Sequence, residues 1–188
     1  MSMPLSQPLT VEQFLAWERG QELRYEFDGV RVVAMTGGTL EHSAIATNLV
    51  EAFRRRLKQP CRSFRGDVKI LAAGSVRYPD AVVTCSPTVR GADTVPDPVV
   101  VFEILSTSTA SVDRVTKNEE YRTTPSIQRY VMLEQTRVAA TVFARAGESW
   151  TGTVTTGDAV LAMPEIGVEL PLRELYADVD LPPPDTDD

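Results

Sequence analysis

The fold of this chain is decided by R-Y-P-D-A-V-V-T-C (residues 77–85) and, after a loop, by V-V-V-F-E-I-L-S-T-S-T (99–109). Asp80 follows a proline at the head of the first apolar run, and Glu103 lies inside the second, the most apolar run in the chain. A carboxylate in an apolar strand is costly to bury unless it is paired or binds a metal. Because the second run is apolar on both faces, we expect a central strand covered on both sides.

On either side of this stretch the sequence alternates between strand and helix patterns. We expect a hairpin around Asp28-Gly29 and further strands over 63–71, 76–85, 129–133, 138–144 and 149–155. Helices are expected from Thr10 to about Gly20, over 41–58, over 111–124 and, as a short element, over 171–176. These patterns predict the α/β (α+β) class, with a mixed β-sheet flanked by helices and additional β-hairpins.

The composition fits one globular domain. Apolar residues make up 43% and charged residues 24% of the 188 positions. We expect a single domain over 9–179 and an acidic, proline-rich disordered tail over 180–188. Cys61 and Cys85 lack metal-type spacing, so we expect no disulfide and a cytoplasmic location. No signal peptide and no run of about 18 apolar residues is found, so no membrane association is expected.

The net charge of -7 is unevenly distributed. Six acids and no base follow Arg173, and without those acids the net charge is -1. Basic residues gather instead in one short segment: Arg54, Arg55, Arg56, Lys58, Arg62, Arg65 and Lys69. Two interpretations of this segment remain open, a solvated helix end favoured by the helix dipole and a nucleic-acid-binding surface.

Three interpretations of Asp80 and Glu103 compete. They could bind a hard cation such as Mg²⁺ for phosphodiester hydrolysis, with Lys117 orienting water or neutralising charge on the phosphate. They could flank a sugar bond as acid and base, although the downstream lysine then has no explanation. They could be structural, with Glu103 in an ion pair and Asp80 capping a turn.

Two helices carry residues that would complete a site with these acids. His42, the single histidine, stands in the first turn of its helix and joins the site only if this helix end faces the carboxylates. Lys117 and Tyr121 lie one turn apart on the same face of the helix expected over 111–124.

The order of these motifs resembles the Uma-two family of restriction endonucleases, within the PD-(D/E)XK nuclease superfamily. The resemblance spans residues 9–176. Its motifs are Y-E-F-D-G (25–29), His42 at a helix start, P-D-A-V-V (79–83), F-E-I-L-S-T-S-T (102–109), D-R-V-T-K-N-E-E-Y (113–121) and P-L-R-E-L-Y (171–176). Where the family usually has G-V-P-E-Y-W, this chain has S-I-Q-R-Y-V (126–131).

The resemblance implies a role for each matching residue. Asp80 and Glu103 would be metal ligands, and the carbonyl of Ile104 would be a third. Glu26 would assist metal or water binding, and His42 would support the site.

The superfamily lysine is absent from its usual place, two positions after Glu103, where this chain has Leu105. The resemblance implies that Lys117 is the relocated catalytic lysine, and Lys69 is a competing supplier of the ammonium. It further implies an endonuclease that hydrolyses DNA phosphodiester bonds with Mg²⁺, or Mn²⁺ as a substitute. The basic segment would contact DNA, and cutting both strands would favour a two-fold homodimer. The alternative is an inactive nuclease-like fold that binds nucleic acid or a protein.

Overall fold

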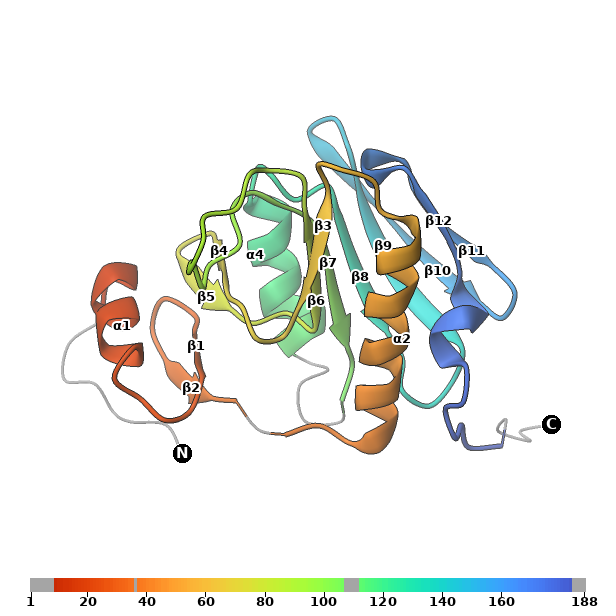
Figure 1. Cartoon of the computed structure of the whole chain (residues 1–188), viewed down its shortest axis with the longest axis horizontal. Coiled ribbons are helices and arrows are strands. Elements are labelled where there is room, and N and C mark those ends of the chain that lie inside the picture. Colours follow the sequence, from red (N-terminus) through yellow and green to blue (C-terminus); the bar gives the residue numbers. More distant parts are fainter. Residues whose placement is uncertain (1–8, 36, 107–111, 184–188) are drawn as a thin grey trace.

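Six strands form a mixed β-sheet at the centre of the computed structural model, which describes residues 9–35, 37–106 and 112–183 (Figure 1). They lie in the order β10-β9-β8-β7-β6-β3. Their bounds are β3 Arg62–Arg65, β6 Ala81–Thr84, β7 Pro98–Ile104, β8 Arg129–Leu133, β9 Ala139–Ala146 and β10 Ser149–Thr156. The β7 and β8 strands run parallel, and the other neighbours run antiparallel. The expected central strand is therefore confirmed as β7, which lies between β6 and β8.

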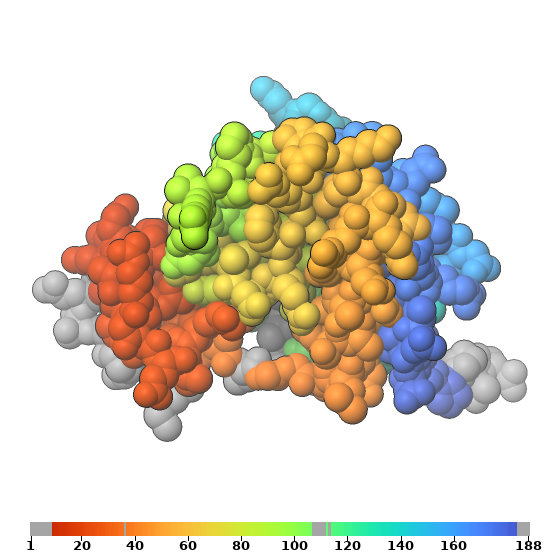
Figure 2. All heavy atoms as spheres, viewed as in Figure 1, coloured from red at the N-terminus to blue at the C-terminus, as the bar shows by residue number. Residues whose placement is uncertain are grey.

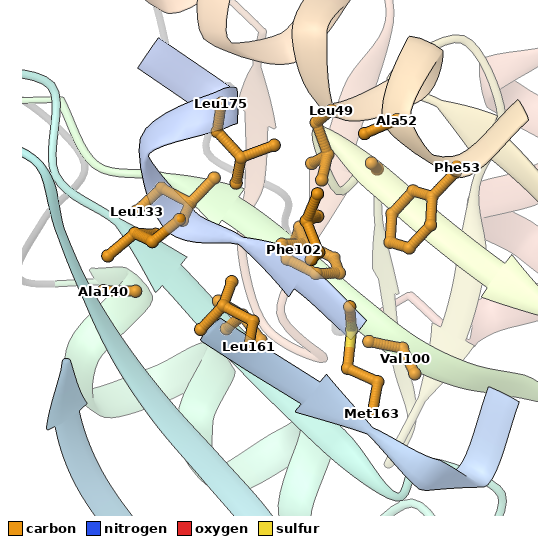
Figure 3. Close-up of a cluster of buried hydrophobic side chains, with 14 of the residues drawn as sticks. Leu49, Ala52, Phe53, Val100, Phe102, Leu133, Ala140, Leu161, Met163 and Leu175 are labelled. Carbon is orange, nitrogen blue, oxygen red and sulfur yellow. The ribbon is translucent and has the colours of Figure 1, made fainter. Parts of the chain in front are cut away.

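One face of this sheet packs against α2 (Leu40–Arg56). Alternate residues of β7 point to this face, so Val100 and Phe102 lie in one apolar cluster with Leu49 and Phe53 of α2 (Figure 3). The rings of Phe53 and Phe102 meet edge to face, with their centroids 5.4 Å apart. The same cluster includes the hairpin of β11 (Val160–Met163) and β12 (Val168–Pro171), the short helix η2 (Pro164–Ile166) and the 3₁₀ helix η3 (Leu172–Tyr176).

The opposite face packs against a helix that starts as the π-helix η1 (Asp113–Lys117) and continues as α4 (Asn118–Thr123). Here Val101 and Leu105 of the β7 region contact a second apolar cluster. Tyr121 of α4 lies edge to face with Tyr130 of β8, at 4.9 Å between centroids. Helices thus flank both faces of a mixed sheet, which confirms the predicted fold class.

A second, smaller sheet lies beside the first in the order β2-β1-β5-β4. Its bounds are β1 Tyr25–Phe27, β2 Val32–Ala34, β4 Ile70–Ala72 and β5 Ser75–Arg77. The helix α1 (Val11–Glu18) covers this sheet, with the ring of Phe14 stacked on that of Phe27 at 5.2 Å. A capping box of Thr10 and Gln13 starts α1, and the predicted hairpin turns at Gly29, whose φ is 85°.

Two predicted strands are wrong in extent, because each divides between the two sheets. The strand expected over 63–71 breaks around Gly66 into β3 and β4, and the strand expected over 76–85 breaks at Tyr78-Pro79 into β5 and β6. Proline has no backbone N–H to donate to a ladder, so the chain leaves one sheet there and enters the other. The chain therefore changes sheets immediately before Asp80.

The C-terminal region contains more structure than the sequence predicted. The hairpin of β11 and β12 was not expected, and the predicted last helix is the 3₁₀ helix η3. Leu181, which the prediction assigned to the disordered tail, packs against the first apolar cluster. Residues 184–188 lie outside the described part of the chain.

The prediction that Cys61 and Cys85 are unpaired is wrong, since the two form a disulfide. Their separation of 24 residues gave no sign of pairing. However, β3 and β6 pair antiparallel with Arg62 opposite Thr84, which brings the residues before and after that pair together. Register between distant strands is a property of the fold and not of local spacing.

None of the helices in the described part of the chain combines the length and apolarity that a membrane span requires.

Candidate active site

The two predicted metal ligands lie at the same end of two neighbouring strands, since Asp80 directly precedes β6 and Glu103 lies in β7. In the antiparallel pair of β6 and β7, Ala81 faces Phe102, so the next pair in this register is Asp80 and Glu103. Opposed residues project to the same face of a sheet. The Glu103 residue is only 4% exposed, whereas the Asp80 side chain is 21% exposed. The pair therefore has a buried acid and an acid that solvent or a substrate can reach.

Both oxygens of Asp80 have protein partners. Oδ2 accepts a hydrogen bond from the backbone N–H of Ile104 at 2.7 Å, at the end of β7. Oδ1 lies 3.1 Å from Nε2 of His42, in the first turn of α2. Thr39 caps this helix by accepting from the N–H of His42, which fixes where its first turn lies. The helix end that carries His42 therefore faces Asp80.

Lys117 reaches the buried acid from the helix that packs on the face of the sheet opposite α2. Its Nζ lies 3.0 Å from Oε1 of Glu103 and 3.2 Å from Oε1 of Glu26 in β1. The hydroxyl of Tyr121 also donates to Glu103 Oε1, at 2.8 Å. Burial, together with the charge of Glu103, holds the pKa of Tyr121 well above its usual range, so this phenol stays a donor. Lys117 is the last residue of η1, and π-helical turns often occur at functional sites.

Arg77 and Glu120 belong to the same network, and the sequence analysis did not find them. Arg77 donates to Glu26 Oε2 at 3.1 Å and to both oxygens of Glu120 in α4, at 2.6 and 2.7 Å. Ser75 also donates to Glu120, at 2.8 Å. These bonds outweigh the effect of burial, and the pKa of Arg77 is raised. Arg77 thus ties β1, β5 and the helix of Lys117 together.

The backbone also fixes Glu26, because the N–H of Tyr78 donates to Glu26 Oε1 at 3.1 Å. One available signal for this arrangement was an arginine at the end of a strand, three residues before Asp80. Such an arginine is buried only with partners, and Glu26 was already a candidate.

Lys69, the competing lysine, lies in a separate buried cluster. Its Nζ is 2.6 Å from Oε2 of Glu18 and 3.0 Å from Oδ2 of Asp93. Burial alone would lower the pKa of Lys69, but these two carboxylates raise it. Glu18 also accepts from the hydroxyl of Tyr78. Lys117 is therefore the lysine that the fold brings to Glu103.

Most of the predicted basic surface lies at the far end of α2 from His42, but Arg65 in β3 lies opposite Ala81, next to Asp80. Twelve residues separate His42 from Arg54, which corresponds to about 18 Å along the helix. Figure 2 shows the amber surface of this region at the top of the molecule, whereas the surface is hollowed lower down, beside the N-terminal half of α2. Arg55 and Arg56 pair with Glu174 at 2.8 and 2.6 Å, which ties α2 to η3. Arg54, Lys58, Arg62 and Arg65 are exposed, whereas Lys69 is buried in its own cluster.

The donors fit a divalent cation in chemical type. Mg²⁺ binds carboxylate oxygens, is often held by one or two of them, and keeps several waters. Asp80 and Glu103 supply two such groups on one face. Within the described residues, no group of three or more His, Cys, Asp or Glu side chains is arranged to hold a metal. A cation here would therefore depend on this pair, a backbone carbonyl and water.

Comparison with known proteins gives the family of this chain. Residues 11–173 match the model of the Uma2 (Uma-two) family, described as "Putative restriction endonuclease". Two Synechocystis proteins described as uncharacterized are similar to this chain. The protein slr1290 is 34% identical, and the match covers 69% of this chain and 70% of slr1290. The protein sll1609 is 27% identical, and the match covers 68% of this chain and 75% of sll1609.

A crystal structure from Anabaena variabilis, described as a "putative nuclease belonging to DUF820", has the same fold, with a TM-score of 0.73 and 19% identity. The match covers 90% of this chain and 98% of that one. The acidic pair, its lysine and the match over most of the chain lead to one conclusion: this protein belongs to the Uma2 family and has a nuclease-like fold.

Proposed function

We propose that this protein is a metal-dependent endonuclease that hydrolyses phosphodiester bonds of DNA. The observation that carries the proposal is the register of β6 and β7, which brings Asp80, at the head of β6, opposite Glu103, with the ammonium of Lys117 at 3.0 Å from Glu103. Membership of a restriction-endonuclease family supports the nuclease class.

Asp80 and Glu103 would hold Mg²⁺ or Mn²⁺, with the carbonyl of Ile104 as a third ligand. A cation bound there would polarise a phosphoryl oxygen and lower the pKa of a water molecule. His42 contacts the outer oxygen of Asp80 and thereby orients this carboxylate. Mutation of a residue that supports a metal ligand in this way typically lowers metal affinity or activity by about 10–100-fold.

Lys117 would act on the attacking water or on the phosphate. Its ammonium has three donors, and the two carboxylates beside it hold it at one point. A positive group fixed there stabilises the negative charge that grows on the phosphate in the transition state. In the reaction the oxygen of water bonds to phosphorus, one P–O ester bond breaks, and the leaving alcohol takes up a proton.

Nicking of supercoiled plasmid tests this proposal. We expect cleavage with Mg²⁺ or Mn²⁺, none with EDTA, and none from Asp80→Ala or Glu103→Gln. Arg173→Gln is the matched control, because the ion pair of Arg173 with Asp158 is exposed and includes no residue of the proposed site. Cleavage at the wild-type rate by the two acid variants would refute the assignment.

One observation favours a second candidate, a nuclease-like fold that only binds nucleic acid or a protein. Among the described residues, both oxygens of Asp80 and Oε1 of Glu103 already have protein partners. Calorimetric titration of wild type and Asp80→Ala with Mn²⁺ separates the candidates. Heat that Asp80→Ala abolishes supports the enzyme, whereas DNA binding without metal binding or cleavage supports the binding module.

A further inference from the structure

We propose that a groove on the outer side of the helix carrying Lys117 binds the sugar-phosphate backbone of the nucleic acid. The groove lies between η1–α4 and the strands β9 and β10, and has a volume of about 590 Å³. Arg114, Asn118, Arg122, Arg145 and Trp150 are among its lining residues. This inference rests on the proposed function and names the surface by which the substrate is held.

Two arginines of the groove keep their positive charge without a carboxylate partner among the described residues. Arg145 donates to three backbone carbonyls, those of Ile127, Arg122 and Thr124, at 2.9–3.0 Å. Its guanidinium also lies 4.6 Å from the ring centroid of Trp150. Carbonyls and an aromatic face hold the guanidinium in place but do not cancel its charge.

Within the described part of the chain, the Arg122 guanidinium contacts two aromatic rings. Its guanidinium lies 5.8 Å from the ring centroid of Phe143 and 6.0 Å from that of Trp150. Because its side chain is exposed, its N–H donors remain accessible to a ligand. Most other arginines, in contrast, have a carboxylate partner. Arg31, Arg77 and Arg129, for example, are paired with acids.

The third arginine, Arg114, is paired with Glu134 at 3.1 Å, but its side chain is 51% exposed. An exposed ion pair contributes little and exchanges readily for a phosphate. Two acids, Glu119 and Glu148, also line the groove, so its surplus of positive charge is one. A surplus carried by ring-held arginines favours phosphate groups, which guanidinium binds with paired hydrogen bonds.

The groove is well placed relative to the site. Arg114, Asn118 and Arg122 recur every four residues along one side of the helix, while Lys117 and Tyr121 point inward to Glu103. A nucleic-acid strand bound in the groove would therefore run along η1 and α4, the helix that carries Lys117. Arg54 and Arg62, in contrast, lie by the C-terminal end of α2 and the far end of β6, whereas Arg65 of the same segment lies opposite Ala81, next to Asp80.

Binding of a fluorescent DNA oligonucleotide to the Asp80→Ala protein tests the proposal without cleavage. We expect Arg122→Ala to weaken binding about tenfold and to reduce the slope of log affinity against log salt by about 0.7–0.9, the value for one phosphate contact. Arg122→Lys should recover most of that slope because it retains the charge. The double variant Arg54→Ala/Arg62→Ala, which removes two exposed arginines of the other surface, should bind as tightly as the parent.

Each outcome decides one question. Unchanged binding by Arg122→Ala, with weaker binding by the Arg54/Arg62 double variant, would overturn the groove and leave the proposed nuclease intact. No DNA binding by any variant, together with no cleavage by wild type, would overturn both. Equal displacement by polyglutamate of matched charge would identify a general polyanion surface and also overturn the proposal.

Discussion

The ammonium of Lys117 lies 3.0 Å from Oε1 of Glu103, although 14 residues of chain separate them. The superfamily pattern would place this lysine two residues after the acid, where Leu105 is buried in the second apolar cluster. The helix formed by η1 and α4 crosses the sheet and supplies the ammonium from outside the strand. The helix thus brings to Glu103 an ammonium that the residues directly after Glu103 do not supply.

Replacing Lys117 with methionine should destabilise the fold and stop cleavage. Glu103 and Glu26 would lose their shared cation while 5% and 14% exposed, and breaking one side of a buried ion pair costs about 3–5 kcal/mol. Urea denaturation measures this loss. The double variant Lys117→Met/Glu26→Gln should recover part of the stability but none of the activity. If Lys117→Met has the same free energy of unfolding as wild type, the buried ion pairs of Lys117 with Glu103 and Glu26 do not contribute to stability.

Arg77→Gln should lower activity without removing any group that we assign to the chemistry. Arg77 is 3% exposed and pairs with both Glu26 and Glu120. Without it, these two carboxylates lose the cation that fixes their positions. We expect a loss of about 3 kcal/mol in unfolding free energy and a fall in kcat greater than any rise in KM. Arg31→Gln is the matched control, because its pair with Asp28 is exposed. Equal effects of the two variants would refute a positioning role for Arg77.

The sequence was sufficient to predict the elements near the site, but not their partners. The apolar run around Glu103 and the helical spacing of Lys117 and Tyr121 are local patterns, and both are confirmed. The division of two predicted strands between sheets depends on which distant strand each segment meets. The same holds for the disulfide and for Arg77, whose acids lie 51 and 43 residues away in sequence. Local spacing contains no record of such pairings.

Tyr78 should make the protein less stable in alkali. Burial and the hydrogen bond to Glu18 raise the pKa of Tyr78 from 10.0 to about 12. The folded state therefore keeps this proton where the unfolded state loses it, and stability that is present below pH 10 is lost as the pH rises to 12. Thermal midpoints of wild type and Tyr78→Phe should converge over this range. A constant difference between the two proteins would contradict the shift.

Glu174 should make the protein less stable in acid, because the folded state lowers the pKa of its carboxyl. The hydrogen bond from Arg56 holds the pKa of Glu174 below its ordinary value of 4.5. Its contribution to stability is therefore present above pH 4.5 and is lost as the pH falls through the lowered pKa. The difference in urea midpoint between wild type and Glu174→Gln should be largest at pH 7 and shrink below pH 4. If Arg56→Gln shows no such acid dependence relative to wild type, the ion pair is not the cause.

The hydrogen bond from the Ile104 amide to Asp80 gives this protein an internal spectroscopic reporter. An amide proton that points at a carboxylate resonates far from its neighbours and exchanges slowly with solvent, and both properties change when that carboxylate gains or loses a partner. The Ile104 signal in a ¹⁵N-labelled sample would thus register the arrival of a cation, of DNA or of a proton at Asp80, at one backbone position and without any added label.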